Sequence, residues 1–231
     1  MKRLVVLLFL LLLISTSPLF SQQIKVTRDF GVWLAVEFKK EISSRFDLSL
    51  MQQIRTFKNA AELDDYVFDL GLRYSINKEF DIGGDLRYTY NKKRVSYREN
   101  NFRYNLDISF KKKVMPKLDL RYRMRYQKEY VDFLSYFWDP SPSDIYSIHI
   151  RNKAKLTLKV NKKNRLFFSS EIYRLTQKHR APFFNKFRLY LGNEMKTSIG
   201  VFNYSIGFQK ELDSIYPYSF ILFKTIYVIR R

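Results

Sequence analysis

Apolar and polar residues alternate along most of the chain with a period of two. In the segment at 117–130, which is "KLDLRYRMRYQKEY", leucine, tyrosine and methionine occupy the even positions from 118 to 126, whereas aspartate, arginine and glutamine occupy the odd positions from 119 to 127. Such alternation predicts a β-strand with one apolar and one polar face. Eleven segments of this kind follow one another, and their apolar rows open at Phe30, Phe46, Tyr66, Phe80, Phe102, Leu118, Tyr146, Leu166, Phe187, Phe202 and Phe220.

The length of these segments favours a membrane barrel over a soluble sheet. Strands in soluble proteins have about 5 to 6 residues, whereas a tilted strand needs about 9 to 11 residues to cross a bilayer. Connections after odd segments are short, as in "INKE" and "NKKN", and those after even segments are longer, as in "TFKNAAELDD", "NKKRVSYREN" and "LTQKHRAPFFN". Outer-membrane barrels place short turns in the periplasm and longer loops outside. We therefore expect an all-β fold, an antiparallel transmembrane β-barrel with that asymmetry.

The number of strands is expected to be about twelve. Bacterial single-chain barrels have even strand numbers, and the weak pattern "QIKVTR" at 23–28 could supply one strand before the eleven clear ones. Ten strands remain possible if two rows merge or one lies off the barrel.

The chain opens with the pattern of a secretory signal peptide. Lys2 and Arg3 precede the apolar run "LVVLLFLLLLI", and "STSPLFS" ends at Ser21, a small residue suited to cleavage. The alternative, an uncleaved anchor, requires about 20 apolar residues, more than this run has. We expect a cleaved signal peptide at 1–21 and a barrel at 22–231 in the outer membrane of a Gram-negative bacterium.

Composition narrows the classes of function. The formal net charge is +20, and the chain has no cysteine, which excludes disulfides and thiolate metal sites. A basic chain can bind nucleic acid, but export and the spread of the charges through alternating strands argue against it. The sequence shows no metal cluster or cofactor motif, so we expect no cofactor and no metal.

If the apolar face contacts lipid, the polar face must line the lumen. A lysine or arginine facing lipid at the midplane would cost about 2 to 4 kcal/mol. Two interpretations of this lining stay open: a network of ion pairs that seals the barrel, or a narrow passage that favours anions. The residues predicted to line the lumen are Asp69, Arg73, Asp85, Arg87, Arg103, Asp107, Arg121, Arg123, Arg125, Arg151, Glu171 and Arg188.

Candidate catalytic chemistry is sparse. Ser147 and His149 share a face in "SIHI", and a serine beside a histidine is the pattern of a nucleophile and its base. Their predicted register points both side chains inward, away from the lipid that a lipid-modifying enzyme would attack. We therefore assign no catalytic residue and keep this enzyme as an alternative.

The longest connection is expected to contact other molecules. Within the segment at 129–144, four aromatic residues lie close together, Phe133, Tyr136, Phe137 and Trp138. It could form an outer contact surface, a plug folded into the lumen or an extension of the strands. Expected partners are outer-membrane lipid and lipopolysaccharide, whose phosphates basic loop residues such as Lys93 and Arg94 could contact.

Four segments carry a resemblance to a known family: "FGVWLAVEF", "YVFDLGLRYSINKEFDIGGDLRYTY", "FRYNLDISFKKKVMPKLDLRYRMRYQKEY" and "FNKFRLYLGNEMKTSIGVFNYSIGFQKELD". They resemble uncharacterised outer-membrane β-barrel proteins that are catalogued only as a domain of unknown function. The resemblance implies an outer-membrane location and insertion by the barrel-assembly machinery, and it carries over no catalytic residue. The chain departs from many such barrels at its end, "TIYVIRR", which lacks a terminal aromatic residue.

These observations predict a non-enzymatic barrel with an arginine-rich lumen, acting in a structural or interaction role through its long loops. A small-solute pore that favours anions and a lipid-modifying enzyme are the alternatives.

Overall fold

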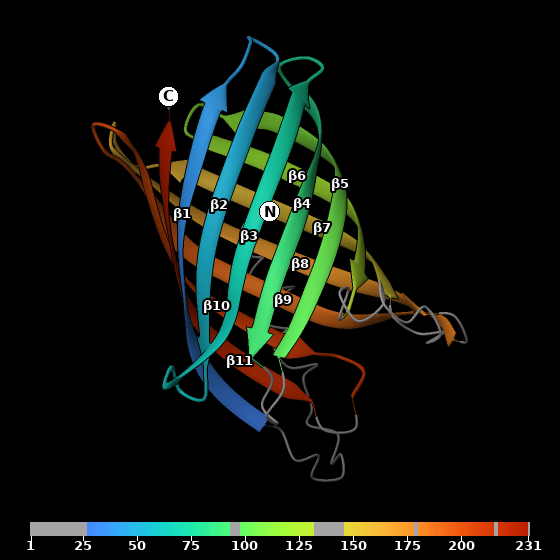
Figure 1. Ribbon diagram of the computed structural model, residues 1–231. Coiled ribbons are helices and arrows are strands. Elements are labelled where there is room, and N and C mark those ends of the chain that lie inside the picture. The colour runs from blue at the N-terminus through green and yellow to red at the C-terminus, as the bar shows by residue number, and fades with distance from the viewer. Residues whose placement is uncertain (1–26, 93–97, 132–145, 178–179, 215–216, 231) are drawn as a thin grey trace, which may run out of the picture.

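The computed structural model describes residues 27–92, 98–131, 146–177, 180–214 and 217–230. These residues form a single sheet that closes on itself as a barrel (Figure 1), and they contain no helix. The strands are β1 (Thr27–Glu41), β2 (Phe46–Phe57), β3 (Glu62–Ser75), β4 (Phe80–Lys92), β5 (Arg98–Met115), β6 (Leu118–Tyr130), β7 (Tyr146–Lys159), β8 (Asn164–Gln177), β9 (Arg180–Lys196), β10 (Gly200–Glu211) and β11 (Tyr218–Arg230).

The described barrel closes with eleven strands, so the expected counts of twelve and ten are both corrected. Consecutive strands pair in antiparallel fashion, and β1 hydrogen-bonds to β11 as well as to β2. With an odd number of strands, the first and last run in the same direction, and the β1–β11 seam is therefore parallel. Thr27 and Arg28, the end of the proposed extra strand, begin β1, and residues 23–26 lie outside the described part of the chain.

The strands present apolar side chains outward and polar side chains inward. On β6, Met124 is 43% exposed while its neighbour Arg125 is 8% exposed. The same contrast recurs around the barrel, where Leu191 and Ile206 are exposed and Gln53 is buried. A soluble β-protein has the opposite arrangement, since its apolar residues form the core. The period-two pattern thus gave the correct faces of these strands.

The turns that follow odd strands all lie at one end of the barrel, which we call the short-turn end (Figure 1). Two of them share one device: Asn77 Oδ1 accepts hydrogen bonds from the backbone N–H groups of Glu79 and Phe80, at 2.9 and 2.8 Å. Asn161 holds the β7–β8 turn in the same way. Asparagine favours such turns because its side chain can replace a backbone acceptor.

Three connections after even strands are shorter than predicted, since β4 and β5 take five residues of the segment 91–100. The β2–β3 connection has only four residues, 58–61, and most of the segment 175–185 belongs to β8 and β9. The sequence was misleading here because alternation weakens near strand ends, although hydrogen-bonded pairing continues.

The β2–β3 turn is unusual in its backbone. Lys58, Asn59 and Ala60 have φ angles of 50°, 56° and 66°, which non-glycine residues seldom adopt. Asp29 on β1 accepts hydrogen bonds from the N–H groups of Lys58 and Asn59, at 3.0 and 2.7 Å. The Tyr218 hydroxyl of β11 also donates to this carboxylate. Asp29 therefore joins the turn to both strands of the seam.

An apolar cluster lies inside the barrel behind the seam. Trp33, Tyr190, Phe220 and Leu222 are buried together, and they come from β1, β9 and β11. At Gly207 on β10, an added Cβ would lie 2.6 Å from the Tyr190 ring, so the close packing there requires glycine. Parallel pairing is slightly less stable per residue than antiparallel pairing, and this cluster adds apolar burial to that side of the barrel.

Replacing Asp29 with alanine should destabilise the barrel by about 1 to 3 kcal/mol, because the strained turn loses its charged acceptor. Asp119→Ala is the matched control: Asp119 forms a half-exposed ion pair with Lys159 at 3.3 Å, and its loss should cost about 0 to 1 kcal/mol. Urea unfolding in detergent micelles measures both. Equal effects of the two substitutions would contradict the role of Asp29.

Candidate functional site in the barrel lumen

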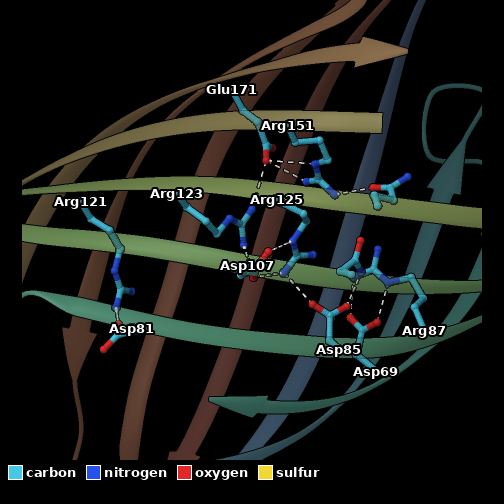
Figure 2. A network of polar contacts seen from close by, with 12 residues as sticks. Asp69, Asp81, Asp85, Arg87, Asp107, Arg121, Arg123, Arg125, Arg151 and Glu171 are labelled. Atoms are coloured by element: carbon cyan, nitrogen blue, oxygen red, sulfur yellow. Dashed lines mark hydrogen bonds and ion pairs between the residues drawn. The ribbon is translucent and has the colours of Figure 1, made fainter. Parts of the chain in front are cut away.

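Arg125 occupies the centre of a charged network in the lumen (Figure 2). Its guanidinium donates to both oxygens of Asp107 at 2.5 Å and lies 2.6 Å from Asp85. Asp107 on β5 is the direct register partner of Arg125 on β6, while Asp85 comes from β4, one strand further. The pairing of two strands thus brings opposite charges together without any loop.

Glu171 is a second centre and accepts from two arginines. Arg151 donates to its Oε1 at 2.8 and 3.2 Å, and Arg123 donates to the same oxygen at 3.1 Å. Arg123 also lies 3.8 Å from Asp107. Arg123 therefore links the two centres, and the network extends without interruption across β4 to β8 (Figure 2).

Further ion pairs surround this network. Arg87 binds both oxygens of Asp69, its register partner, at 2.6 and 2.5 Å. Pairs with single contacts follow the same logic. They are Arg55 with Asp65 (3.0 Å), Arg73 with Asp47 (3.6 Å), Arg103 with Glu129 (2.6 Å), and both Lys111 (2.5 Å) and Arg121 (3.4 Å) with Asp81.

Eleven of the twelve residues predicted to line the lumen take part in these ion pairs. Arg188 has a different environment: it donates to Gln209 at 2.5 Å and to the Tyr173 hydroxyl at 2.6 Å. Its guanidinium also lies 5.3 Å from the centre of the Trp33 ring. It therefore belongs to the aromatic side of the lumen, next to the seam.

The lumen widens into a cavity of about 1190 Å³ that includes residues of the short-turn end. We call it the basic chamber, because thirteen lysines and arginines line it against six carboxylates. A smaller cavity of about 390 Å³ shares Lys153, Lys155 and Lys224 with it and reaches Arg125. The network around Arg125 thus borders the deeper part of this space.

Lys153, Glu194 and Lys224 are among the charged residues of the chamber that sequence reasoning missed. Glu194 lies in "NEMK", which was interpreted as a turn but is the end of β9. Lys224 lies within the apolar run of β11, whose inward positions include the buried Phe220 and Leu222. The parity of the alternation was the signal that could have placed all three.

The Ser147 and His149 pair is not assembled as a catalytic site. The two ring nitrogens of His149 lie near amide groups, with Gln127 Nε2 at 3.5 Å and Asn185 Nδ2 at 3.4 Å. Among the described residues no hydrogen bond joins Ser147 to His149. His149 is buried in the barrel.

No group of three or more metal-ligating side chains is found within the described ranges. The aromatic loop residues Phe133, Tyr136, Phe137 and Trp138, together with Lys93 and Arg94, lie outside the described residues. No helix in the described part of the chain is long and apolar enough to cross a membrane.

Fold and lumen together define a closed β-barrel protein with an apolar outer wall and an ion-paired interior. The chain belongs to the family described as "Protein of unknown function (DUF2490)", which matches residues 30–210. A search of the curated proteins finds no match. The family agrees with the resemblance seen in the sequence.

Replacing Arg125 with methionine should cost about 3 to 5 kcal/mol of stability, because Asp85 would lose its guanidinium partner and Asp107 would keep only the 3.8 Å contact with Arg123. Arg121→Met on the same strand is the control. The Arg121 side chain is 42% exposed, and its partner Asp81 keeps Lys111 at 2.5 Å. Its loss should cost no more than about 1 kcal/mol.

Thermal unfolding in micelles compares the two variants. Adding Asp85→Asn and Asp107→Asn to Arg125→Met should recover part of the loss, since the unpaired charges are then removed. An Arg125 variant as stable as the Arg121 variant would show that the network does not support the barrel.

Proposed function

We propose that the protein is a non-enzymatic outer-membrane β-barrel of a Gram-negative bacterium, with its lumen closed near the middle. The proposal rests on the arrangement of the two faces of the sheet, which is the reverse of that in a soluble β-protein. Leucines and isoleucines are exposed on the outside, and the ion pairs lie inside the barrel. An apolar surface of this extent is unfavourable in water and favourable in hydrocarbon. Strands of twelve to eighteen residues are long enough to cross a bilayer.

Aromatic residues on the outer wall support the same proposal. Tyr130 and Tyr146 flank Lys128, whose Nζ lies 5.0 and 4.3 Å from the two ring centres. These residues lie near the end opposite the short turns. Tyrosine and lysine are favoured at the boundary between hydrocarbon and headgroups, where they would contact phosphates of lipid or lipopolysaccharide.

A closed lumen favours a structural or interaction role over a pore. At the level of the apolar cluster, Trp33 and Leu222 are buried inside the barrel, and the Arg125 network fills the opposite wall. Small barrels are commonly filled by their own side chains. The outer segment at 129–144 would then contact partners. The barrel-assembly machinery would insert the protein into the membrane.

The surroundings of His149 support the absence of catalysis. Both ring nitrogens face amide groups inside the barrel, away from acyl chains in the surrounding membrane. We expect the wild-type protein to release no fatty acid from phospholipid vesicles, as measured by free fatty-acid assay. Hydrolysis that disappears in His149→Ala would overturn this part of the proposal.

Cell fractionation and conductance test the location and the closed lumen. The protein should sediment with the outer membrane, and it should migrate faster in electrophoresis before heating than after, as folded barrels do. In planar bilayers the inserted barrel should give no steady conductance.

Recovery in the soluble periplasm would contradict the membrane proposal. Steady anion-selective openings would instead support the pore, and the charged network would then be its selectivity element. Because the two measurements are separate, a pore in the outer membrane would overturn only the closed lumen.

A further inference from the structure

We infer that the basic chamber is a binding site for a phosphate-bearing organic anion that enters at the short-turn end. The chamber has a surplus of seven positive charges, since thirteen cationic side chains face six carboxylates. Its volume of about 1190 Å³ slightly exceeds that of typical ligand-binding pockets, roughly 300 to 1,000 Å³, so a small organic anion would fit. The inference rests on the proposed function only for its entry side, the periplasm.

Lys153 and Lys224 are the expected anchors of the phosphate. They come from β7 and β11, and their Nζ atoms lie 5.6 and 5.9 Å from the centre of the same ring, that of Tyr190. Among the residues that the structure describes, neither has a carboxylate within 4.0 Å. Two ammonium groups of like charge beside one ring are thus left without a counter-ion of the protein.

Two neighbouring cations of the chamber are paired with a carboxylate, in contrast to Lys153 and Lys224. Lys155, on the same strand as Lys153, contacts Glu194 at 2.5 Å, and Arg165 contacts the other oxygen of Glu194 at 2.9 Å. An anion between Lys153 and Lys224 would supply the missing charge, and its attraction would be stronger there than in bulk water. Lysine serves as a point charge for phosphate in many sites.

The walls near the seam suit the organic part of such a ligand. Phe167, Val201, Ile226 and Val228 line the chamber together with the Tyr190 ring. They lie on strands β8, β10 and β11, and Tyr190 lies on β9 between β8 and β10. A ring or short acyl chain attached to the phosphate would therefore contact apolar side chains. Both a soluble phosphate ester and a lipid headgroup have this chemistry.

Trp33 provides a built-in reporter of occupancy. The Lys224 Nζ lies 5.9 Å from the centre of its ring, so an anion that draws this ammonium group away should change the indole emission. The chain has two tryptophans, and Trp138→Phe leaves Trp33 as the single tryptophan, which can be excited selectively.

The experiment titrates the full-length protein, extracted in nonionic detergent and carrying Trp138→Phe, with phenyl phosphate. Trp33 emission and calorimetric heat should saturate together at one ligand per barrel, and added salt should weaken the binding. Inorganic phosphate should bind more weakly and phenol not at all. Dihexanoyl phosphatidic acid separates the sources: tighter binding than phenyl phosphate indicates a lipid headgroup, and weaker binding a soluble ester.

Matched variants locate the site. The double variant Lys153→Gln with Lys224→Gln should weaken binding about tenfold or more, since each lost charged contact is worth roughly a factor of ten. Lys58→Gln with Lys210→Gln removes the same charge outside the chamber and should bind within about twofold of the parent. Lys153→Arg with Lys224→Arg keeps the charge, so it should retain binding and tests the site even if the glutamine variant folds poorly.

Absence of a saturable signal, or equal weakening in the two glutamine variants, would overturn the inference. Because binding is measured in detergent, it can fail while the barrel is still found in the outer membrane. If the protein binds phenyl phosphate but is not found in the outer membrane, the chamber is still a binding site and only the proposed location is wrong.

Discussion

Closure of the sheet through the parallel seam between β1 and β11 is the constraint on which the other features depend. An open sheet would leave two rows of unpaired backbone groups, which are costly in any apolar surrounding. Closure also creates an interior, and the register of eleven strands decides which side chains meet there. Two residues stabilise the seam in ways that the sequence pattern did not predict. Asp29 bonds to the β2–β3 turn and to Tyr218 on β11, and Trp33 packs against the apolar cluster inside the barrel.

The interior divides into two chemically different halves. Strands β4 to β8 contribute the arginines and carboxylates that pair around Arg125 and Glu171. Strands β9 to β11 and β1 contribute aromatic and aliphatic side chains around Trp33. A lumen filled in this way combines the directional contacts of ion pairs with the close packing of an apolar core. The basic chamber is lined by residues of both halves, and it contains the unpaired Lys153 and Lys224.

Much of this architecture could be predicted because a period of two carries both the strand and its faces. The inward position of Arg125 and its neighbours followed from the parity of "KLDLRYRMRYQKEY", once the strand lengths had indicated a membrane barrel. Which carboxylate meets which arginine could not be predicted, since Glu171 pairs with arginines on β6 and β7 only through a register that spans several strands. The strand count failed because the even-number rule of bacterial barrels does not apply to this parallel closure.

The odd number of strands also separates the two ends of the described chain. Thr27 begins β1 at the end opposite the short turns, while Arg230 ends β11 at the short-turn end, next to Ile199. In an even-stranded barrel both ends meet at one rim, and a short linker could join them to give a circular permutant. Here such a linker would have to run the full height of the barrel. The two ends of the described chain therefore mark opposite rims of the barrel.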